Sequence, residues 1–434
     1  MSALRRQALL LPALVLVAAT AGAQSPGEAA FRAAADWTVQ IRTSVSRPFI
    51  EDEQGSWLGA GLLVDAERGW ILTNAHVAGR SYGKIMLAFR DGRALPAQRL
   101  YVDPYVDLAV ISFQPTSAQR QIRTPTLNCG ALPPVGHPVG AFGHPWGFRF
   151  TATRGITSAV STRLGTTMLQ TDAPINEGNS GGPLISLETG QVVGINAAKI
   201  KEESVEGLSF AVPMSYGCTI LDRLRQGRDP SPPMRLVDFA HDEDDEQTMV
   251  VARSRLPAGS LDLRSGDEIL GLGTSTQAIT TESDLMDALR GELGAISLKV
   301  RRDGRDVEIK GRWPAAPSVT AREGLWMSGA LVAEAEPLTA GQIAEHPALM
   351  VHHVESGSEA EAAGLQDYDL VLSADGAPVD SLPLLLERAQ RARSAGRPLA
   401  LMLLRIGSDM TDEFFRHEQR QLPIEDLEHI GPPH

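Results

Sequence analysis

The chain has 434 residues, of which 43% are hydrophobic and 21% charged, a composition that builds packed cores and excludes a long disordered chain. This length suggests about two to four domains. The formal net charge is −13, which argues against a nucleic-acid partner because non-specific nucleic-acid binders are usually basic. Two cysteines are too few for a disulfide scaffold. Cys129 and Cys218 either pair in an oxidising compartment or stay free thiols.

The first 23 residues have the three-part layout of a secretory signal peptide. Arg5 and Arg6 precede an apolar run, Ala8–Ala19, and Ala21-Gly22-Ala23 has the small residues of a cleavage site. The run is shorter than the ~20 apolar residues of a membrane-spanning helix. We therefore expect residues 1–23 to be removed and the remaining chain to be exported to the periplasm.

Residues 37 to 213 consist of short β-prone runs separated by turn residues, for example Gly61–Val64 and Gln191–Ile195. Many short strands at this spacing predict a barrel or a sandwich. A helical apolar pattern follows over Met214–Arg225. Gly227–Pro233 then contains three prolines, which is typical of a stiff linker.

The C-terminal half contains an internal repeat, because Leu263–Leu270 aligns with Leu365–Leu372. In each copy a Gly-Ser turn comes before the repeat, and a helical stretch and a β-run come after it, so the copies predict two related α+β modules. We place module 1 at residues 234–314 and module 2 at 321–423, followed by a tail at 424–434. Asp303-Gly304 between two β-runs predicts a hairpin turn in module 1.

Three separate segments each carry one group of a possible serine hydrolase site: His76, Asp107 and Ser180. A serine hydroxyl needs a neighbouring base, and a histidine oriented by a carboxylate supplies one near neutral pH. The glycines of Gly178–Gly182 allow a tight turn whose N–H groups can stabilise an oxyanion. The order His, Asp, Ser is that of chymotrypsin-like enzymes, and it argues against an α/β-hydrolase, in which the serine comes first.

The protease region resembles the HtrA/Deg family of serine proteases over its whole length, and the two repeats resemble PDZ domains. The segments that carry the protease resemblance are Thr73–Val77, Asp107–Val110, Phe142–Gly147, Gly155–Val160, Gln170–Ala173, Gly178–Leu184 and Phe210–Pro213. The resemblance implies a mainly β protein, with a chymotrypsin-like double β-barrel protease domain at residues 24–228 and two PDZ-like α+β domains after it.

The resemblance also implies the roles of the site residues. Ser180 would attack the substrate, His76 would act as base and then acid, and Asp107 would orient His76. The N–H groups of Gly178, Asn179 and Ser180 would line the oxyanion hole. No metal or organic cofactor would be needed, the substrates would be unfolded or misassembled envelope proteins, and the chain would form homotrimers or multiples of them.

Four residues match the positions that line the first specificity pocket in this family: Ile175, Ala198, Lys199 and Ile200. Aliphatic walls would favour small aliphatic residues before the cut. Lys199 departs from the apolar residue usual there, and either its stem lines the pocket or its amine shifts the preference towards acidic side chains. The interval Ser161–Thr167 is shorter than the family's sensor loop, which puts in doubt a relay from the PDZ domains.

PDZ domains bind a peptide C-terminus by strand addition, with loop N–H groups holding the carboxylate. In module 2, Gly324-Leu325-Trp326-Met327 stands where this loop is expected. In module 1, Met234–Phe239 has no comparable glycine, and the acidic residues 242–246 follow it. We expect module 2 to bind peptide C-termini better than module 1.

An alternative function is a peptide-binding scaffold or holdase chaperone in which the protease domain is dormant. Cleavage of an unstructured protein by the wild type and by Ser180→Ala distinguishes the two functions. A metal site at His352-His353 is not expected, because adjacent residues of a strand point to opposite faces.

Overall fold

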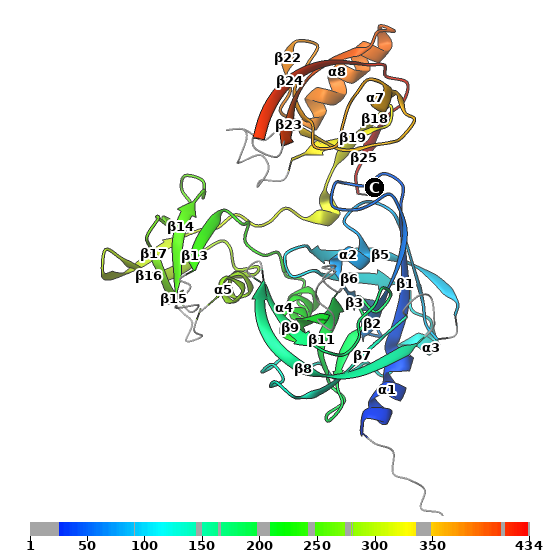
Figure 1. Ribbon diagram of the computed structural model, residues 1–434, viewed down its shortest axis with the longest axis vertical. Coiled ribbons are helices and arrows are strands. Elements are labelled where there is room, and N and C mark those ends of the chain that lie inside the picture. Colours follow the sequence, from blue (N-terminus) through cyan, green and yellow to red (C-terminus); the bar gives the residue numbers. More distant parts are fainter. Residues whose placement is uncertain are drawn as a thin grey trace, which may run out of the picture.

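The computed structural model describes residues 26–90, 92–144, 150–163, 166–197, 209–241, 248–273, 279, 281–335, 349–408 and 413–432. In these ranges the chain forms two closed six-stranded barrels and, after them, two sheets that belong to modules 1 and 2 (Figure 1). The mainly β class and the double barrel expected from the sequence are confirmed. The predicted signal peptide, residues 1–23, lies outside the described residues.

The first barrel has the strand order β1-β2-β3-β6-β5-β4, and every pairing is antiparallel. Its interior is filled by side chains with no exposed surface, including Ile41, Leu62, Ile71 and Leu108. Helix α1 (Pro26–Trp37) precedes the barrel. The other elements are β1 (Thr38–Val45), β2 (Gly55–Asp65), β3 (Trp70–Thr73), α2 (Ala75–Ala78), β4 (Lys84–Ala88), β5 (Ala94–Asp103), β6 (Leu108–Phe113) and α3 (Ser117–Arg120).

The second barrel has the strand order β10-β11-β12-β9-β8-β7. Its strands are β7 (Pro138–Gly143), β8 (Thr151–Arg163), β9 (Thr166–Thr171), β10 (Pro183–Ser186), β11 (Val192–Ala197) and β12 (Ser209–Pro213). Helix α4 (Met214–Arg225) returns from this barrel to the first, where Ile220 and Leu221 join the first barrel's core. A disulfide between Cys218 of α4 and Cys129 decides between the two cysteine alternatives.

Module 1 is a five-stranded antiparallel sheet with one described helix, α5 (Glu282–Leu289). Its strands are β13 (Val237–His241), β14 (Met249–Ser254), β15 (Glu268–Leu272), β16 (Ile296–Arg302) and β17 (Arg305–Gly311). The core contains Leu285 of α5 together with Leu298, Val300 and Trp313. Asp303 and Gly304 both have positive φ between β16 and β17, so the predicted hairpin is confirmed.

Module 2 is an eight-stranded sheet covered by helix α8 (Leu382–Ser394). A 3-10 turn, η2 (Val319–Ala321), leads into it from module 1. The remaining elements are β18 (Gly324–Met327), β19 (Ala330–Glu334), β20 (Leu349–Val354), α7 (Glu359–Ala362), β21 (Leu370–Ala374), β22 (Ala377–Pro378), β23 (Leu399–Ser408), β24 (Glu413–Leu422) and β25 (Leu427–Ile430). Because β25 pairs with β18, the expected end of module 2 at residue 423 is too early.

The internal repeat is visible as the same buried ion pair in both modules. Asp267 and Asp369 are each 1% exposed, and each accepts hydrogen bonds from an arginine of the neighbouring strand, Arg302 or Arg405. A buried carboxylate requires such a partner, so the repeated aspartate is explained by the fold.

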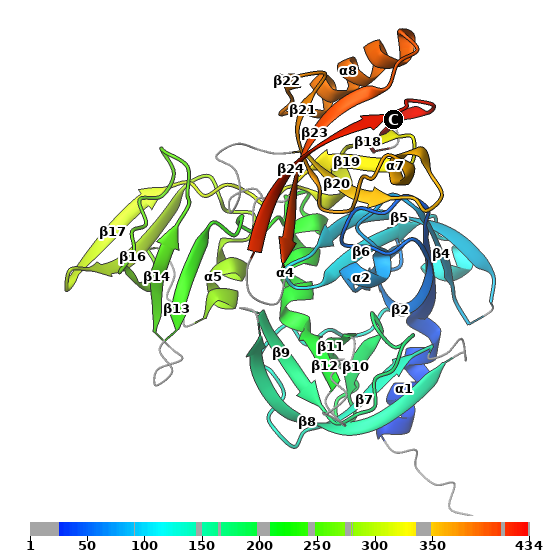
Figure 2. The same ribbon diagram turned by 45° about the horizontal axis from the view of Figure 1, so that its top comes forward.

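The modules lie on two sides of the barrels. Module 1 lies beside α4 and the second barrel, and module 2 lies above the first barrel in both views (Figure 1 and Figure 2). No helix in the described ranges is both long enough and apolar enough to span a membrane.

Candidate active site

His76 and Asp107 meet at one end of the first barrel. His76 lies on the short helix α2 after β3, and Asp107 lies on the turn between β5 and β6. The His76 Nδ1 and Asp107 Oδ2 atoms are 2.8 Å apart, and the His76 backbone N–H donates to Asp107 Oδ1 at 3.0 Å. The Asn74 side chain donates to the Asp107 carbonyl at 2.9 Å. The carboxylate is therefore fixed against one ring nitrogen, which leaves Nε2 for a nucleophile.

The electrostatics of this pair favour the imidazolium form. Burial lowers the pKa of His76, but the charge of Asp107 and the hydrogen bond to it outweigh burial, so the pKa of His76 is raised above 6.5. His76 therefore binds a proton more tightly than an ordinary histidine does.

Ser180 is brought to the first barrel by backbone contacts. The Ala60 N–H of β2 donates to the Ser180 carbonyl at 2.8 Å, and the Thr73 hydroxyl donates to the Ala60 carbonyl at 2.7 Å. Gly181 follows with φ of 82°, and a Cβ there would lie 2.2 Å from Thr73 Oγ1. Ser180 is 7% exposed. Within the described residues, its hydroxyl makes no hydrogen bond to His76.

The turn before Ser180 presents fewer free N–H groups than the resemblance implied. Gly178 has φ of 95°. The Asn179 N–H donates to the Asn176 carbonyl at 2.9 Å, so it is not free to serve an oxyanion and its expected role is corrected. The N–H groups of Gly178 and Ser180 have no intramolecular acceptor among the described residues, which leaves two donors for the oxyanion hole.

The expected specificity pocket is described only at Ile175. That side chain is 1% exposed and packs in the core of the second barrel with Leu169, Ala173 and Leu184. The Ile175 N–H donates to Ser209 Oγ at 3.3 Å. The other three expected pocket residues, Ala198, Lys199 and Ile200, lie outside the described residues.

The expected carboxylate-binding loop of module 2 is a strand. Gly324, Leu325, Trp326 and Met327 form β18, which pairs with β19 on one edge and with β25 on the other. The Trp326 indole donates to Asp426 at 2.9 Å. The hydrophobic pattern of these four residues suits a buried strand as well as a loop, and the sequence offered no sign of β25. In this conformation module 2's own chain occupies the edge at β18.

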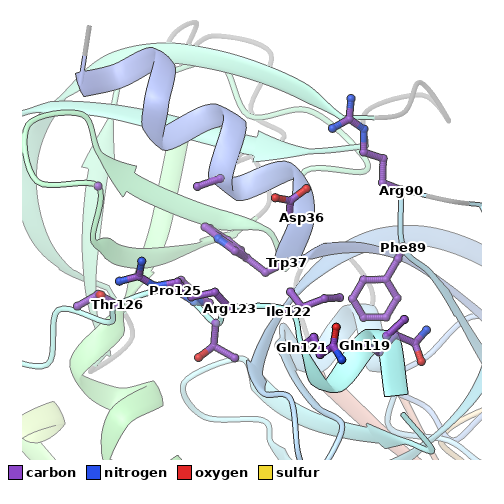
Figure 3. A pocket seen from close by; sticks show the side chains of 14 residues that line it. Asp36, Trp37, Phe89, Arg90, Gln119, Gln121, Ile122, Arg123, Pro125 and Thr126 are labelled. Carbon is purple, nitrogen blue, oxygen red and sulfur yellow. The ribbon is translucent and has the colours of Figure 1, made fainter. Parts of the chain in front are cut away.

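A pocket of about 680 Å³ lies away from the triad, between helix α1 and the segment that follows α3 (Figure 3). Trp37 and Phe89 line it together with the charged side chains of Asp36, Arg90 and Arg123. None of the triad residues lines this pocket.

Comparison with known proteins agrees with this geometry. Residues 59–195 match the trypsin-like peptidase domain family. A probable periplasmic serine endoprotease DegP-like from Halomonas elongata is 30% identical over 77% of this chain and 74% of its own length. Serine endoprotease DegS from Escherichia coli is 37% identical over 39% of this chain and 49% of its own length. The solved HtrA-type protease AlgW with tripeptide has a TM-score of 0.54 at 28% identity, covering 67% of this chain and 97% of that one.

Proposed function

Because the chain belongs to the HtrA/Deg family of serine endoproteases, we propose that it cleaves unfolded or misassembled periplasmic proteins through His76, Asp107 and Ser180. The observation that carries the proposal is the paired contact of Asp107 with both the ring and the backbone of His76, close to where Ala60 holds the Ser180 segment.

In the proposed mechanism Ser180 Oγ attacks the scissile carbonyl carbon while His76 Nε2 takes the hydroxyl proton. The N–H groups of Gly178 and Ser180 donate to the oxyanion. His76 returns the proton to the leaving amine, which frees the C-terminal fragment and leaves an acyl-enzyme. A water molecule, deprotonated by His76, then releases the N-terminal fragment. Asp107 keeps the imidazole in the correct tautomer throughout.

The proposed compartment is supported by two observations. Several relatives are named periplasmic serine endoproteases. The Cys129–Cys218 disulfide belongs in an oxidising compartment. We further propose peptide C-termini as ligands of module 2 and a homotrimer or a multiple of it as the assembly. A native mass measurement with and without unfolded substrate tests the assembly.

A second serine offers a matched control for the nucleophile. Ser186 Oγ lies 2.8 Å from His137 Nε2, and His137 Nδ1 lies 3.6 Å from Glu188. This is the hydrogen-bond pattern of a triad, but Ser186 is 1% exposed and its hydroxyl accepts the Thr189 N–H. Burial keeps substrate away, so Ser186→Ala should retain activity.

The test compares the wild type, Ser180→Ala and Ser186→Ala on an unfolded model protein and with a fluorophosphonate that labels active serines. We expect cleavage and labelling to be lost only in Ser180→Ala, with the label located at Ser180 by mass spectrometry. Equal cleavage by the wild type and Ser180→Ala would reject the proposed nucleophile. Suppression of aggregation without any cleavage by the wild type would favour the holdase function.

A further inference from the structure

The turn that carries Asp107 is held by a buried carboxylate four residues earlier. Asp103 has no exposed surface. Its Oδ1 accepts the N–H groups of Tyr105 and Val106 at 3.0 and 3.2 Å, and its Oδ2 accepts the Tyr101 hydroxyl at 2.9 Å. Asp107 ends this turn with φ of 51°, a strained conformation for a residue with a side chain, which persists only where its surroundings enforce it.

The charge partner of Asp103 comes from module 1. Arg290 follows helix α5, its side chain is 1% exposed, and its Nη1 contacts Asp103 Oδ2 directly. The same guanidinium donates to the Pro230 carbonyl at 3.0 Å and to Asp287 at 3.2 Å. A buried carboxylate that loses its arginine partner is strongly destabilised, so the turn depends on module 1 for its charge balance.

Module 1 reaches the same turn by a second route. Ser283 at the start of α5 accepts the Thr167 N–H of β9 at 2.9 Å, and the adjacent Thr166 hydroxyl donates to the Tyr105 carbonyl at 3.1 Å. The Arg235 guanidinium lies 4.9 Å from the Tyr105 ring centre. The end of α5 at Arg290 therefore contacts residues 101–103 directly, and its start at Ser283 reaches Tyr105 through β9. Helix α5 lies on the side of module 1 that faces α4 and β9 (Figure 1 and Figure 2).

We propose that Arg290 is a positioning residue for the triad, so that module 1 is a structural part of the active site as well as an appended domain. The proposal rests on the proposed function of Asp107. Arg290 does not touch substrate. It fixes Asp103, Asp103 fixes the N–H groups of the turn, and the turn fixes the carboxylate on His76.

The experiment uses the full chain with Arg290→Met and Arg290→Lys. Lysine keeps a positive charge beside Asp103 but loses the other hydrogen bonds of the guanidinium. The kcat of Arg290→Lys should therefore lie between those of Arg290→Met and the wild type. Arg223→Met is the matched control, because Arg223 joins the same interface through Glu292 at 3.2 Å. Within the described part of the chain, no hydrogen bond or ion pair joins Arg223 to the turn. For each variant, kcat and KM on a fluorogenic peptide and the pH profile of kcat/KM are measured.

We expect kcat of Arg290→Met to fall about a hundredfold, as for a small misplacement of a catalytic group, with KM unchanged and Arg223→Met close to wild type. The direction in which the pH profile moves distinguishes a positioning role from a merely structural one. Losing a nearby cation would raise the pKa of His76, whereas losing the Asp107 contact lowers it. We expect the acidic limb of kcat/KM to move to lower pH.

The proposal is overturned if folded Arg290→Met has the wild-type kcat, or if its acidic limb of kcat/KM moves to higher pH. The Ser180→Ala variant tests the proposed function separately. If Arg290→Met does not fold, Ser283→Ala takes its place, because it keeps the buried ion pair and removes the hydroxyl that accepts the Thr167 N–H and also bonds Tyr216. That variant should show the same direction of pH shift with a smaller loss of kcat, and no change in either quantity would equally overturn the proposal.

Discussion

Phe49, in the loop between β1 and β2, meets His352 of module 2 edge-on, with ring centres 5.4 Å apart and ring planes at 87°. Phe49 has no exposed surface and packs with Trp326, Leu331 and Ala333 of module 2. The adjacent Ile50 N–H donates to His352 Nδ1 at 3.3 Å. A loop of the protease domain thus anchors module 2.

Phe49→Ala should release module 2 from the first barrel. Truncating a buried phenylalanine costs about 3–5 kcal/mol, and here the loss falls on contacts between the two domains. Small-angle scattering should show a larger radius of gyration, and proteolysis should become faster near residues 315–323. Phe415→Ala is the control, because that side chain is 54% exposed. An unchanged scattering curve for Phe49→Ala would contradict the anchoring role.

Docking of module 2 should weaken in acid. Burial and the nearby Arg322 guanidinium lower the pKa of His352 to about 4, although Glu51 opposes them. Since the undocked or unfolded histidine has a pKa near 6.5, the docked form binds fewer protons. The stability that neutral His352 gives to the docked form is therefore complete above about pH 6.5 and is lost as the pH falls towards 4. Thermal unfolding between pH 7 and 4 measures this, and His352→Phe should flatten the dependence. If the melting temperature of His352→Phe falls equally steeply with pH, the loss of stability is due to other groups.

Activity should fall on acidification at a higher pH than an ordinary histidine would give. The pKa of His76 is raised above 6.5, and only its neutral form accepts the Ser180 proton. The acidic limb of kcat/KM should therefore lie above pH 6.5. Asp107→Asn should move the limb down and reduce kcat about ten-thousandfold. A wild-type limb below pH 6 would be inconsistent with the His76–Asp107 contact.

Gly181→Ala should abolish activity and destabilise the protease domain. A Cβ at Gly181 would lie 2.1 Å from the Ala60 carbonyl oxygen and 2.2 Å from Thr73 Oγ1, so the two barrels would be forced apart at Ser180. Gly136→Ala separates backbone strain from this clash, because Gly136 has φ of 86° with no atom within 4 Å of its Cβ position. It should cost about 1–3 kcal/mol and keep activity. Similar melting temperatures and cleavage rates for both variants would show that backbone strain, and not the clash, causes the effect of Gly181→Ala.

Much of the active site could be predicted from the sequence because its groups lie in short, distinctive segments. His76, Asp107 and the Gly178–Gly182 turn were found by residue type and order, and the fold brings His76 and Asp107 into contact. The sequence does not show that the Asn179 N–H is already bonded, because its acceptor, the Asn176 carbonyl, is set by the turn's conformation. The contact of Phe49 with module 2 cannot be predicted from the sequence, because a single apolar residue in a loop gives no periodic signal.

The sequence by itself predicts short strands of a barrel or a sandwich, three candidate groups of a serine hydrolase site and two repeated modules, because strand alternation, residue order and local turns are encoded within short stretches. The resemblance to the HtrA/Deg family implies the double barrel. Only the tertiary structure decided that β25 closes the sheet at β18, that Cys129 meets Cys218, and that Arg290 enters the protease domain to pair with Asp103. These contacts join residues far apart in the chain. Their energies depend on burial and charge pairing, which exist only once the domains have packed together.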